Sequence, residues 1–185
     1  MIQRYKEVKY SLYATDFNPE TKQFSNTRMI YNAADSAINA SVTLPRVSPD
    51  GRYIIFSQAE YGCFHVWHND ADIYMLDLKT SKVRKLDQLN SNRSESYPTW
   101  SSNGRWIMVD SRRGDGNYTR PYIAYFDRQG KVHKPFIVPQ KDPSFYTFLL
   151  RSFNRPEFMK EPVRVSPTEF AKKAKEDAVK AKFAK

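Results

Sequence analysis

Apolar and polar residues alternate in short runs along this chain, and two of these runs follow closely related turns. The segment Pro45–Ser57 reads PRVSPDGRYIIFS, and Pro98–Ser111, which begins 53 residues later, reads PTWSSNGRWIMVDS. Gly51 and Gly104 then occupy equivalent positions in an Asp-Gly and an Asn-Gly pair, which tolerate the positive φ of a tight hairpin turn. A period of about 50 residues predicts repeated β units of the size of propeller blades.

A second element recurs downstream of each of these turns. It reads DIYMLDLKTSKVRKL in Asp72–Leu86 and YIAYFDRQGKVHKPF in Tyr122–Phe136, with Asp77 equivalent to Asp127. A looser third copy covers Leu12–Ile30. Each copy is a β-rich strand, a short polar turn and a second strand, and so predicts a hairpin. Two hairpins in succession give four antiparallel strands, the content of one propeller blade.

These motifs resemble the TolB-like β-propeller family of bacterial proteins, whose blades pair a Ser-Pro-Asp-Gly turn with an Ile-Tyr-x-x-Asp hairpin. Ser48-Pro49-Asp50-Gly51 matches the turn fully, Ser101-Ser102-Asn103-Gly104 matches it in part, and Ile73–Asp77 supplies the hairpin. The resemblance extends over residues 42–158, and implies the C-terminal blades of an envelope protein located in the periplasm. The residues that match the family form turns and strands, so the resemblance indicates a fold and identifies no catalytic residue.

The predicted fold class is all-β, a partial β-propeller of two to three four-stranded antiparallel blades followed by a short C-terminal α-helix. We divide the chain into five parts: a partial blade with its lead-in (1–44), a blade with the SPDG turn (45–97), a blade with the SSNG turn (98–139), an aromatic closing segment (140–165) and a basic helical tail (166–185). Closed propellers have roughly four to eight blades. We therefore expect a fragment of a longer protein, with mutually completing protomers or an open stack as alternatives, and we expect self-association of the isolated chain.

Composition adds few constraints on location or cofactors. No run of 18 apolar residues is present, and the first 14 residues contain no signal-peptide core. The expected periplasmic location therefore follows from the family resemblance alone. Cys63 is the single cysteine, which leaves no internal disulfide and no Cys-x-x-Cys motif, and we expect no cofactor.

The net charge is +10, with 30 Lys and Arg against 20 Asp and Glu. Part of this excess lies in the tail, where six Lys follow the capping box Ser166-Pro167-Thr168-Glu169 in an Ala-rich run typical of a solvated helix. A thin stripe of Phe170 and alanines favours a helix lying loosely on the body over one bound to a membrane surface. Nucleic acid is therefore not the expected partner.

Two loops contain the candidate binding residues. In CFHVWHNDAD, residues 63–72, His65, Trp67 and His68 are either part of a binding surface or of a packed hairpin loop. An alternating strand would place His65 and Trp67 on one face, but Asn69-Asp70 indicates a loop, so we expect no metal site here.

The equivalent loop of the next blade carries Arg112, Arg113, Tyr118 and Arg120. Arg and Tyr are common in binding hot spots, and Arg grips carboxylates with a bidentate fork. The competing interpretation is structural, with an Asp-Gly-Asn turn and arginines paired to acids on a neighbouring blade. If the loops bind a partner, they are expected to lie on the same rim of the propeller.

No nucleophile elbow, zinc-protease motif, phosphate-binding glycine loop or EF-hand loop is present in the sequence. The expected function is therefore a non-enzymatic scaffold that binds a protein or peptide in the bacterial envelope. Two alternatives stay open: the accessory propeller domain of a peptidase-type hydrolase, and polyanion binding through the basic surface.

Overall fold

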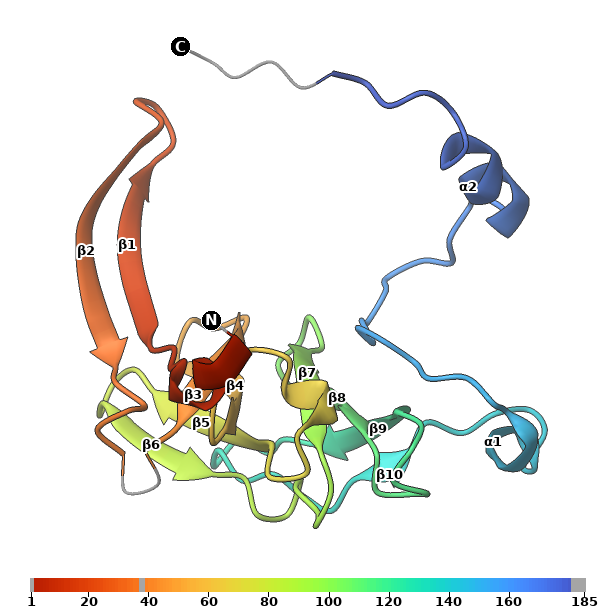
Figure 1. Ribbon diagram of the computed structural model, residues 1–185, viewed down its shortest axis with the longest axis horizontal. Helices are drawn as coiled ribbons and strands as arrows, with labels where there is room; N and C mark the ends of the chain where they lie inside the picture. The colour runs from red at the N-terminus through yellow and green to blue at the C-terminus, as the bar shows by residue number, and fades with distance from the viewer. Residues whose placement is uncertain (1, 37–38, 181–185) are drawn as a thin grey trace.

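Two four-stranded antiparallel sheets lie next to each other in the computed structural model, which describes residues 2–36 and 39–180 (Figure 1). The strands of each sheet follow one another in chain order. The first sheet consists of β3 (Ser41–Val47), β4 (Tyr53–Ala59), β5 (Asp72–Asp77) and β6 (Lys82–Lys85). The second consists of β7 (Glu95–Trp100), β8 (Trp106–Ser111), β9 (Arg120–Tyr125) and β10 (Phe136–Ile137). This arrangement confirms the predicted fold class, a mostly β chain built from propeller-like sheets.

The repeated turn sequence forms the same hydrogen-bonded turn in both sheets. Ser48 Oγ donates to Asp50 Oδ1 at 2.6 Å and accepts a hydrogen bond from the Tyr53 amide at 2.9 Å. In the second sheet the corresponding distances are 2.7 and 2.9 Å, between Ser101, Asn103 and Trp106. Gly51 has a φ of 72° and Gly104 a φ of 64°, which confirms the predicted left-handed conformation. The sequence repeat therefore encodes one side-chain network that closes the turn between the first two strands of each sheet.

The predicted equivalence of Asp77 and Asp127 is wrong by two residues. Tyr53 on β4 pairs with Asp77, whereas the equivalent Trp106 on β8 pairs with Tyr125. Asp127 lies beyond the end of β9 and caps the next turn, where its Oδ1 accepts hydrogen bonds from two backbone amides, those of Gln129 and Lys131. Both aspartates cap turns at the end of a third strand, which is why their sequences look alike although their registers differ.

The looser third copy forms a two-stranded hairpin, as predicted. Its strands are β1 (Leu12–Asn18) and β2 (Gln23–Tyr31), and Asn18 Oδ1 accepts hydrogen bonds from the amides of Glu20 and Thr21 in the turn between them. The hairpin extends away from the two sheets (Figure 1). Its base packs on the first sheet through Leu12, and its outer part is largely exposed.

Strand β4 is buried along its entire length because it contributes side chains to two hydrophobic clusters. Tyr53 and Ile55 belong to the cluster between the two sheets, and Ile54 and Phe56 belong to the cluster beneath the β1–β2 hairpin. The cluster between the sheets also contains side chains from the second sheet, among them Trp100, Ile107, Val109 and Phe126. Because successive side chains of a strand point to opposite faces, β4 packs against the second sheet on one face and against the base of the β1–β2 hairpin on the other.

Helices are short in the described part of the chain. Its two α-helices, α1 (Phe145–Phe148) and α2 (Pro167–Lys173), lie near the C-terminus. Its two 3-10 helices, η1 (Ile2–Glu7) and η2 (His65–Trp67), precede β1 and β5, where the sequence did not predict a helix. The capping box at Ser166 and Glu169 forms as predicted. The expected helical tail over 166–185 is wrong in length, since α2 has seven residues and no buried side chain; residues 181–185 lie outside the described part of the chain. Isolated helices without a packed face are marginal in water.

Within residues 2–36 and 39–180, no helix is long and apolar enough to cross a membrane.

The turn network generates a stability prediction at Gly51. A Cβ added here would meet nothing within 4 Å, so the cost of substitution comes from the positive φ alone. We expect Gly51→Val to lower the free energy of unfolding by more than about 1 kcal/mol in a urea titration, because a β-branched residue is strained in this region. The control, Gly51→Asn, is expected to lose clearly less, because Asn tolerates the left-handed region. Equal stability of the Val variant and the wild type would contradict the turn assignment.

Candidate functional site

A groove of about 270 Å³ lies where the loop between β4 and β5 meets the loop between β8 and β9. Its walls come from four parts of the chain: η2 with the residue before it, strand β7 through Tyr97, the β8–β9 loop, and residues 152–154 of the C-terminal segment. The residues around it are Phe64, Val66, Trp67, Tyr97, Arg112, Asn117, Thr119, Ser152, Phe153 and Asn154. Phe64 is 71% exposed and Trp67 is 68% exposed, so two large aromatic side chains stand open to solvent.

The loop between β4 and β5 is fixed by His65, which is fully buried. Its ring nitrogens lie 3.2 Å from Ser57 Oγ and 3.0 Å from the Gly62 carbonyl oxygen, and its own carbonyl accepts a hydrogen bond from Ser94 Oγ. Burial lowers the pKa of His65 to about 4, so the ring is neutral at pH 7. His65 therefore positions the loop instead of contacting a ligand at the surface.

The 3-10 turn of η2 separates two residues that an alternating strand would have placed together. His65 points into the protein, while Trp67 faces the groove. His68 packs against Tyr61, with ring centroids 4.4 Å apart, and its Nδ1 lies 3.9 Å from Asp70. No group of three metal-ligating side chains is formed in the described part of the chain. These contacts favour the interpretation of residues 63–72 as a packed loop that presents two aromatic side chains, Phe64 and Trp67.

The predicted meeting of the two loops on one rim is confirmed at Arg112 and Trp67. The Arg112 guanidinium lies over the Trp67 ring, 4.8 Å from its centroid, and both residues line the groove. The β8–β9 loop is held by Asp115, whose Oδ1 accepts hydrogen bonds from the amides of Asn117 and Tyr118 at 2.7 and 2.8 Å. A guanidinium stacked on an indole is attracted to the ring face and still presents its edge to a partner.

The Arg113 side chain makes its contacts within the protein and stabilises the second sheet. Its guanidinium donates to Glu95 Oε1 at 3.1 Å, to the Leu89 carbonyl and to Ser111 Oγ, and it stacks on Tyr122 at 4.5 Å. Glu95 is fully buried on β7, the strand next to β8, so the acid that pairs with Arg113 belongs to the same sheet and not to a neighbouring blade. Arg113 thereby neutralises a buried carboxylate and is not available as a contact residue.

Arg120 is likewise buried and anchors the C-terminal segment. Its guanidinium donates to three backbone carbonyls of that segment, those of Tyr146, Leu149 and Arg151. Tyr118 stacks on the same guanidinium at 5.1 Å and is half-buried. Four of the sequence candidates, His65, Arg113, Tyr118 and Arg120, therefore form the support of the groove, and Trp67 and Arg112 form its surface.

The aromatic closing segment contributes to the groove, which the sequence did not predict. The Phe153 amide donates to the Thr119 carbonyl at 3.1 Å, and the Thr119 amide donates to Ser152 Oγ, so residues 152–154 run beside the start of β9 and complete the groove. Phe64 and Tyr97 were also missed. The aromatic content of residues 142–159 was a signal for packing, but sequence spacing gave no reason to place this segment beside the two loops.

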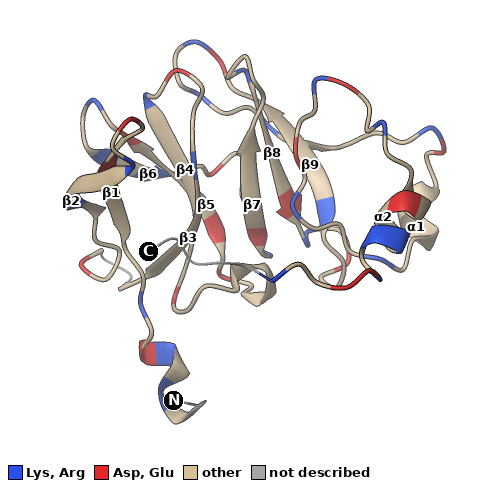
Figure 2. Cartoon of the chain, turned by 90° about the horizontal axis from the view of Figure 1, so that it is seen from above, with Lys and Arg blue, Asp and Glu red and all other residues tan. Residues whose placement is uncertain are grey.

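Acidic residues occupy the groove end of strands β5, β7 and β8, as the red segments in Figure 2 show. Asp110, on β8 two residues before Arg112, is fully buried, and neither carboxylate oxygen has a hydrogen-bond partner among the described residues. Desolvation raises the pKa of Asp110 to about 7, although the nearby backbone amide of Arg155 acts in the opposite direction. The carboxyl is therefore close to half protonated at neutral pH.

A comparison with protein-family models found no match, and a comparison with curated proteins found none either. Among solved structures, the chain is similar to TolB from Acinetobacter baumannii, with 22% identity over 66% of this chain and 26% of that one, and a TM-score of 0.42. It is also similar to the β-propeller domain of the Trilobed protease from Pyrococcus furiosus, with 19% identity over 70% of this chain and 39% of that one, and a TM-score of 0.39. For the Dos1 propeller the identity is 18%, over 70% and 32% of the two chains, with a TM-score of 0.46.

The chain thus spans well under half the length of these proteins. These similarities concern the propeller fold alone.

Asp110 generates a prediction for the pH dependence of stability. Its pKa in the folded state is raised from 3.8 to about 7, so the folded protein binds this proton more tightly than the unfolded chain does. The contribution of this group to the free energy of unfolding is fully present below about pH 4. It falls by up to about 4 kcal/mol as the pH rises to about 7. Asp110→Asn should remove this loss, and should therefore be more stable than the wild type at pH 8.

Urea titrations at pH 5, 6, 7 and 8 measure the effect. The exposed Asp87→Asn variant serves as the control and should keep the pH dependence of the wild type. Parallel curves for Asp110→Asn and the wild type would show that Asp110 is ionised in the folded protein throughout this range.

Proposed function

We propose that this chain is part of a non-enzymatic β-propeller scaffold that binds a protein or peptide through the groove between its β4–β5 and β8–β9 loops. The observation that carries the proposal is the pair of exposed aromatic residues at the groove, Phe64 and Trp67, with the Arg112 guanidinium stacked on Trp67. Trp, Tyr and Arg are the residues that most often dominate binding energy at protein interfaces. The resemblance to the TolB-like family supports a location in the periplasm.

The size and lining of the groove favour a side chain of a partner over a free metabolite. Its volume of about 270 Å³ lies below the usual range of small-molecule pockets, about 300–1,000 Å³. Its rim combines apolar rings with a few polar groups. Two of these are already engaged, since the Thr119 hydroxyl donates to the Phe153 carbonyl and the Ser152 hydroxyl accepts a hydrogen bond from the Thr119 amide. An apolar side chain of a peptide could insert beside Trp67 while the peptide backbone meets Arg112 and Asn117 at the edge.

The scaffold around the groove supports a preorganised site. His65 fixes the first loop, Asp115 fixes the second, and Arg120 holds the closing segment by three carbonyl oxygens. Because these contacts are all made within the chain, they order the loops independently of a partner, and binding would cost little ordering entropy.

Selection of a displayed library of random 12-residue peptides on the full chain tests the proposal. The selected peptides should bind with a Kd that rises at least tenfold in Trp67→Ala and in Phe64→Ala, measured by fluorescence anisotropy, because the groove loses its apolar wall. Phe24→Ala is the matched control, since Phe24 is also 71% exposed but lies on the β1–β2 hairpin.

Two results would contradict the groove as the binding site. One is that the same peptides bind wild type and Trp67→Ala equally well. The other is that removal of residues 172–185 alone abolishes binding and that the affinity falls steeply with salt, as expected for a polyanion attracted to the basic tail.

A further inference from the structure

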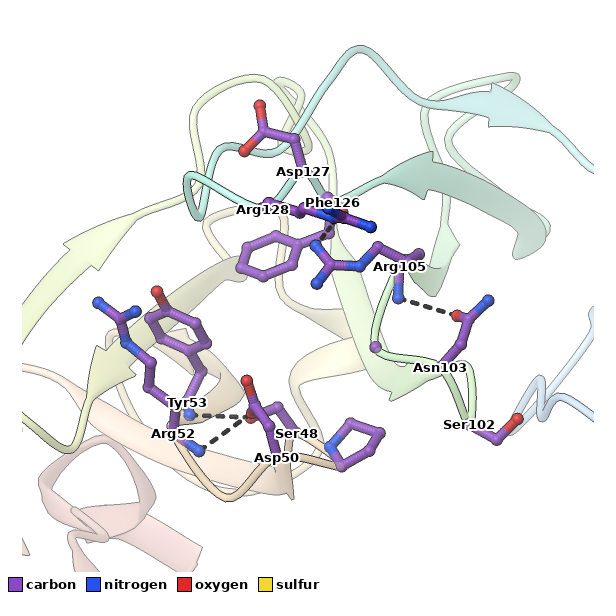
Figure 3. A pocket seen from close by; sticks show the side chains of 12 residues that line it. Ser48, Asp50, Arg52, Tyr53, Ser102, Asn103, Arg105, Phe126, Asp127 and Arg128 are labelled. Carbon is purple, nitrogen blue, oxygen red and sulfur yellow. Dashed lines mark hydrogen bonds between the residues drawn. The ribbon is translucent and has the colours of Figure 1, made fainter.

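A second cavity, of about 300 Å³, lies at the opposite end of β4 and β8 from the groove (Figure 3). It is formed by the Ser48–Tyr53 turn of the first sheet, the Ser102–Arg105 turn of the second sheet and residues 126–128 after β9. The two turns are in close contact, since a Cβ on Gly104 would lie 3.6 Å from Pro49 Cδ. The cavity therefore depends on the packing of one sheet against the other and includes both copies of the repeated turn.

Three arginines line this cavity, and two of them have no carboxylate partner. Arg52 pairs with Asp77 at 3.1 Å, so its charge is balanced. Arg105 and Arg128 form no ion pair within residues 2–36 and 39–180, and Arg105 makes only one long contact, 3.5 Å from its Nη1 to the Phe126 carbonyl. Figure 3 shows both on the side of the cavity opposite Asp50. Their guanidinium groups give this side of the cavity an uncompensated positive charge.

The two carboxylates nearby leave that charge in place. Asp127 is directed away from the cavity in Figure 3 and its Oδ2 lies 3.0 Å from the His133 ring. Asp50 is on the opposite wall, where its Oδ1 accepts hydrogen bonds from Ser48 Oγ and from the Arg52 amide. Both aspartates are thus used to close their own turns and pair with neither Arg105 nor Arg128.

Asn103 orders the backbone beside Arg105 and adds no donor to the cavity. Its Oδ1 accepts hydrogen bonds from Ser101 Oγ at 2.7 Å and from the Arg105 amide at 3.0 Å, and Figure 3 shows its Nδ2 on the side away from the Arg105 guanidinium. The donors of this wall are therefore the guanidinium groups of Arg105 and Arg128. Guanidinium groups bind carboxylates by paired, charge-assisted hydrogen bonds.

The geometry points to this cavity as a second binding site, separate from the groove, that takes a carboxylate side chain from an acidic segment of a protein partner. Arg105 and Arg128 would bind the two carboxylate oxygens with their guanidinium groups. Tyr53 and Phe126 supply the rings beneath, and Asp50 on the far wall would repel a second negative charge placed close to it. The site therefore favours one carboxylate at a time over a dense polyanion.

Calorimetry on the full chain with a blocked tetraglutamate peptide tests the inference, with blocked tetraglutamine as the uncharged probe. Binding of tetraglutamate should weaken at least tenfold in Arg105→Gln and in Arg128→Gln, since each removes a charged donor. Arg164→Gln is the matched control, because Arg164 is exposed in the C-terminal segment and distant in sequence from the cavity. Arg128 is exposed on a turn, so its variant should keep the melting temperature of the wild type.

Chemical shifts of the arginine Nε–H groups provide a second readout, in which tetraglutamate should move the signals that Arg105→Gln and Arg128→Gln remove. The inference is overturned if tetraglutamine binds equally well, if Arg164→Gln weakens binding as much as Arg105→Gln does, or if inorganic phosphate binds and tetraglutamate does not. Absence of tetraglutamate binding at millimolar concentration and low salt would overturn it as well.

Discussion

The two-sided burial of β4 is the constraint on which the rest of the structure depends. Its apolar run is covered on one face by the second sheet and on the other by the base of the β1–β2 hairpin. Each large aliphatic or aromatic side chain buried in this way contributes about 2 kcal/mol of transfer free energy. The strand therefore fixes the distance and orientation of the two sheets, and the positions of the loops at both of its ends follow from it.

The two ends of the sheets differ chemically because different connections emerge there. Tight turns of a repeated sequence form one end of the sheets. The Ser, Asp and Asn side chains of these turns form hydrogen bonds within their own turn, and Arg105 and Arg128 line the cavity between the two turns. Longer loops form the other end. They are long enough to bury their own polar residues and to expose Phe64 and Trp67.

Buried polar groups hold the groove end together. Glu95 accepts from Ser91, Ser111 and Arg113, while Arg120 donates to the carbonyls of the closing segment. Removing one partner of such a network leaves an uncompensated buried group, which is costly. Arg113 and Arg120 therefore stabilise the fold, whereas Arg112 lines the groove. Asp110 differs from Glu95, because neither oxygen of its carboxylate has a partner among the described residues and its pKa is raised by burial.

The sequence by itself determined the local elements of this protein, because those depend on interactions between near neighbours. The serine, the Asp or Asn and the glycine of each turn bond within five residues, and the capping box at Ser166 spans three. The tertiary structure decided the rest. Whether Arg113 faces a partner or Glu95, whether His65 is exposed or buried, and which segment lies beside Trp67 all depend on contacts between residues distant in the chain. Alternation and composition constrain such contacts only weakly, since an arginine satisfies the same pattern in a buried ion pair and on an open rim.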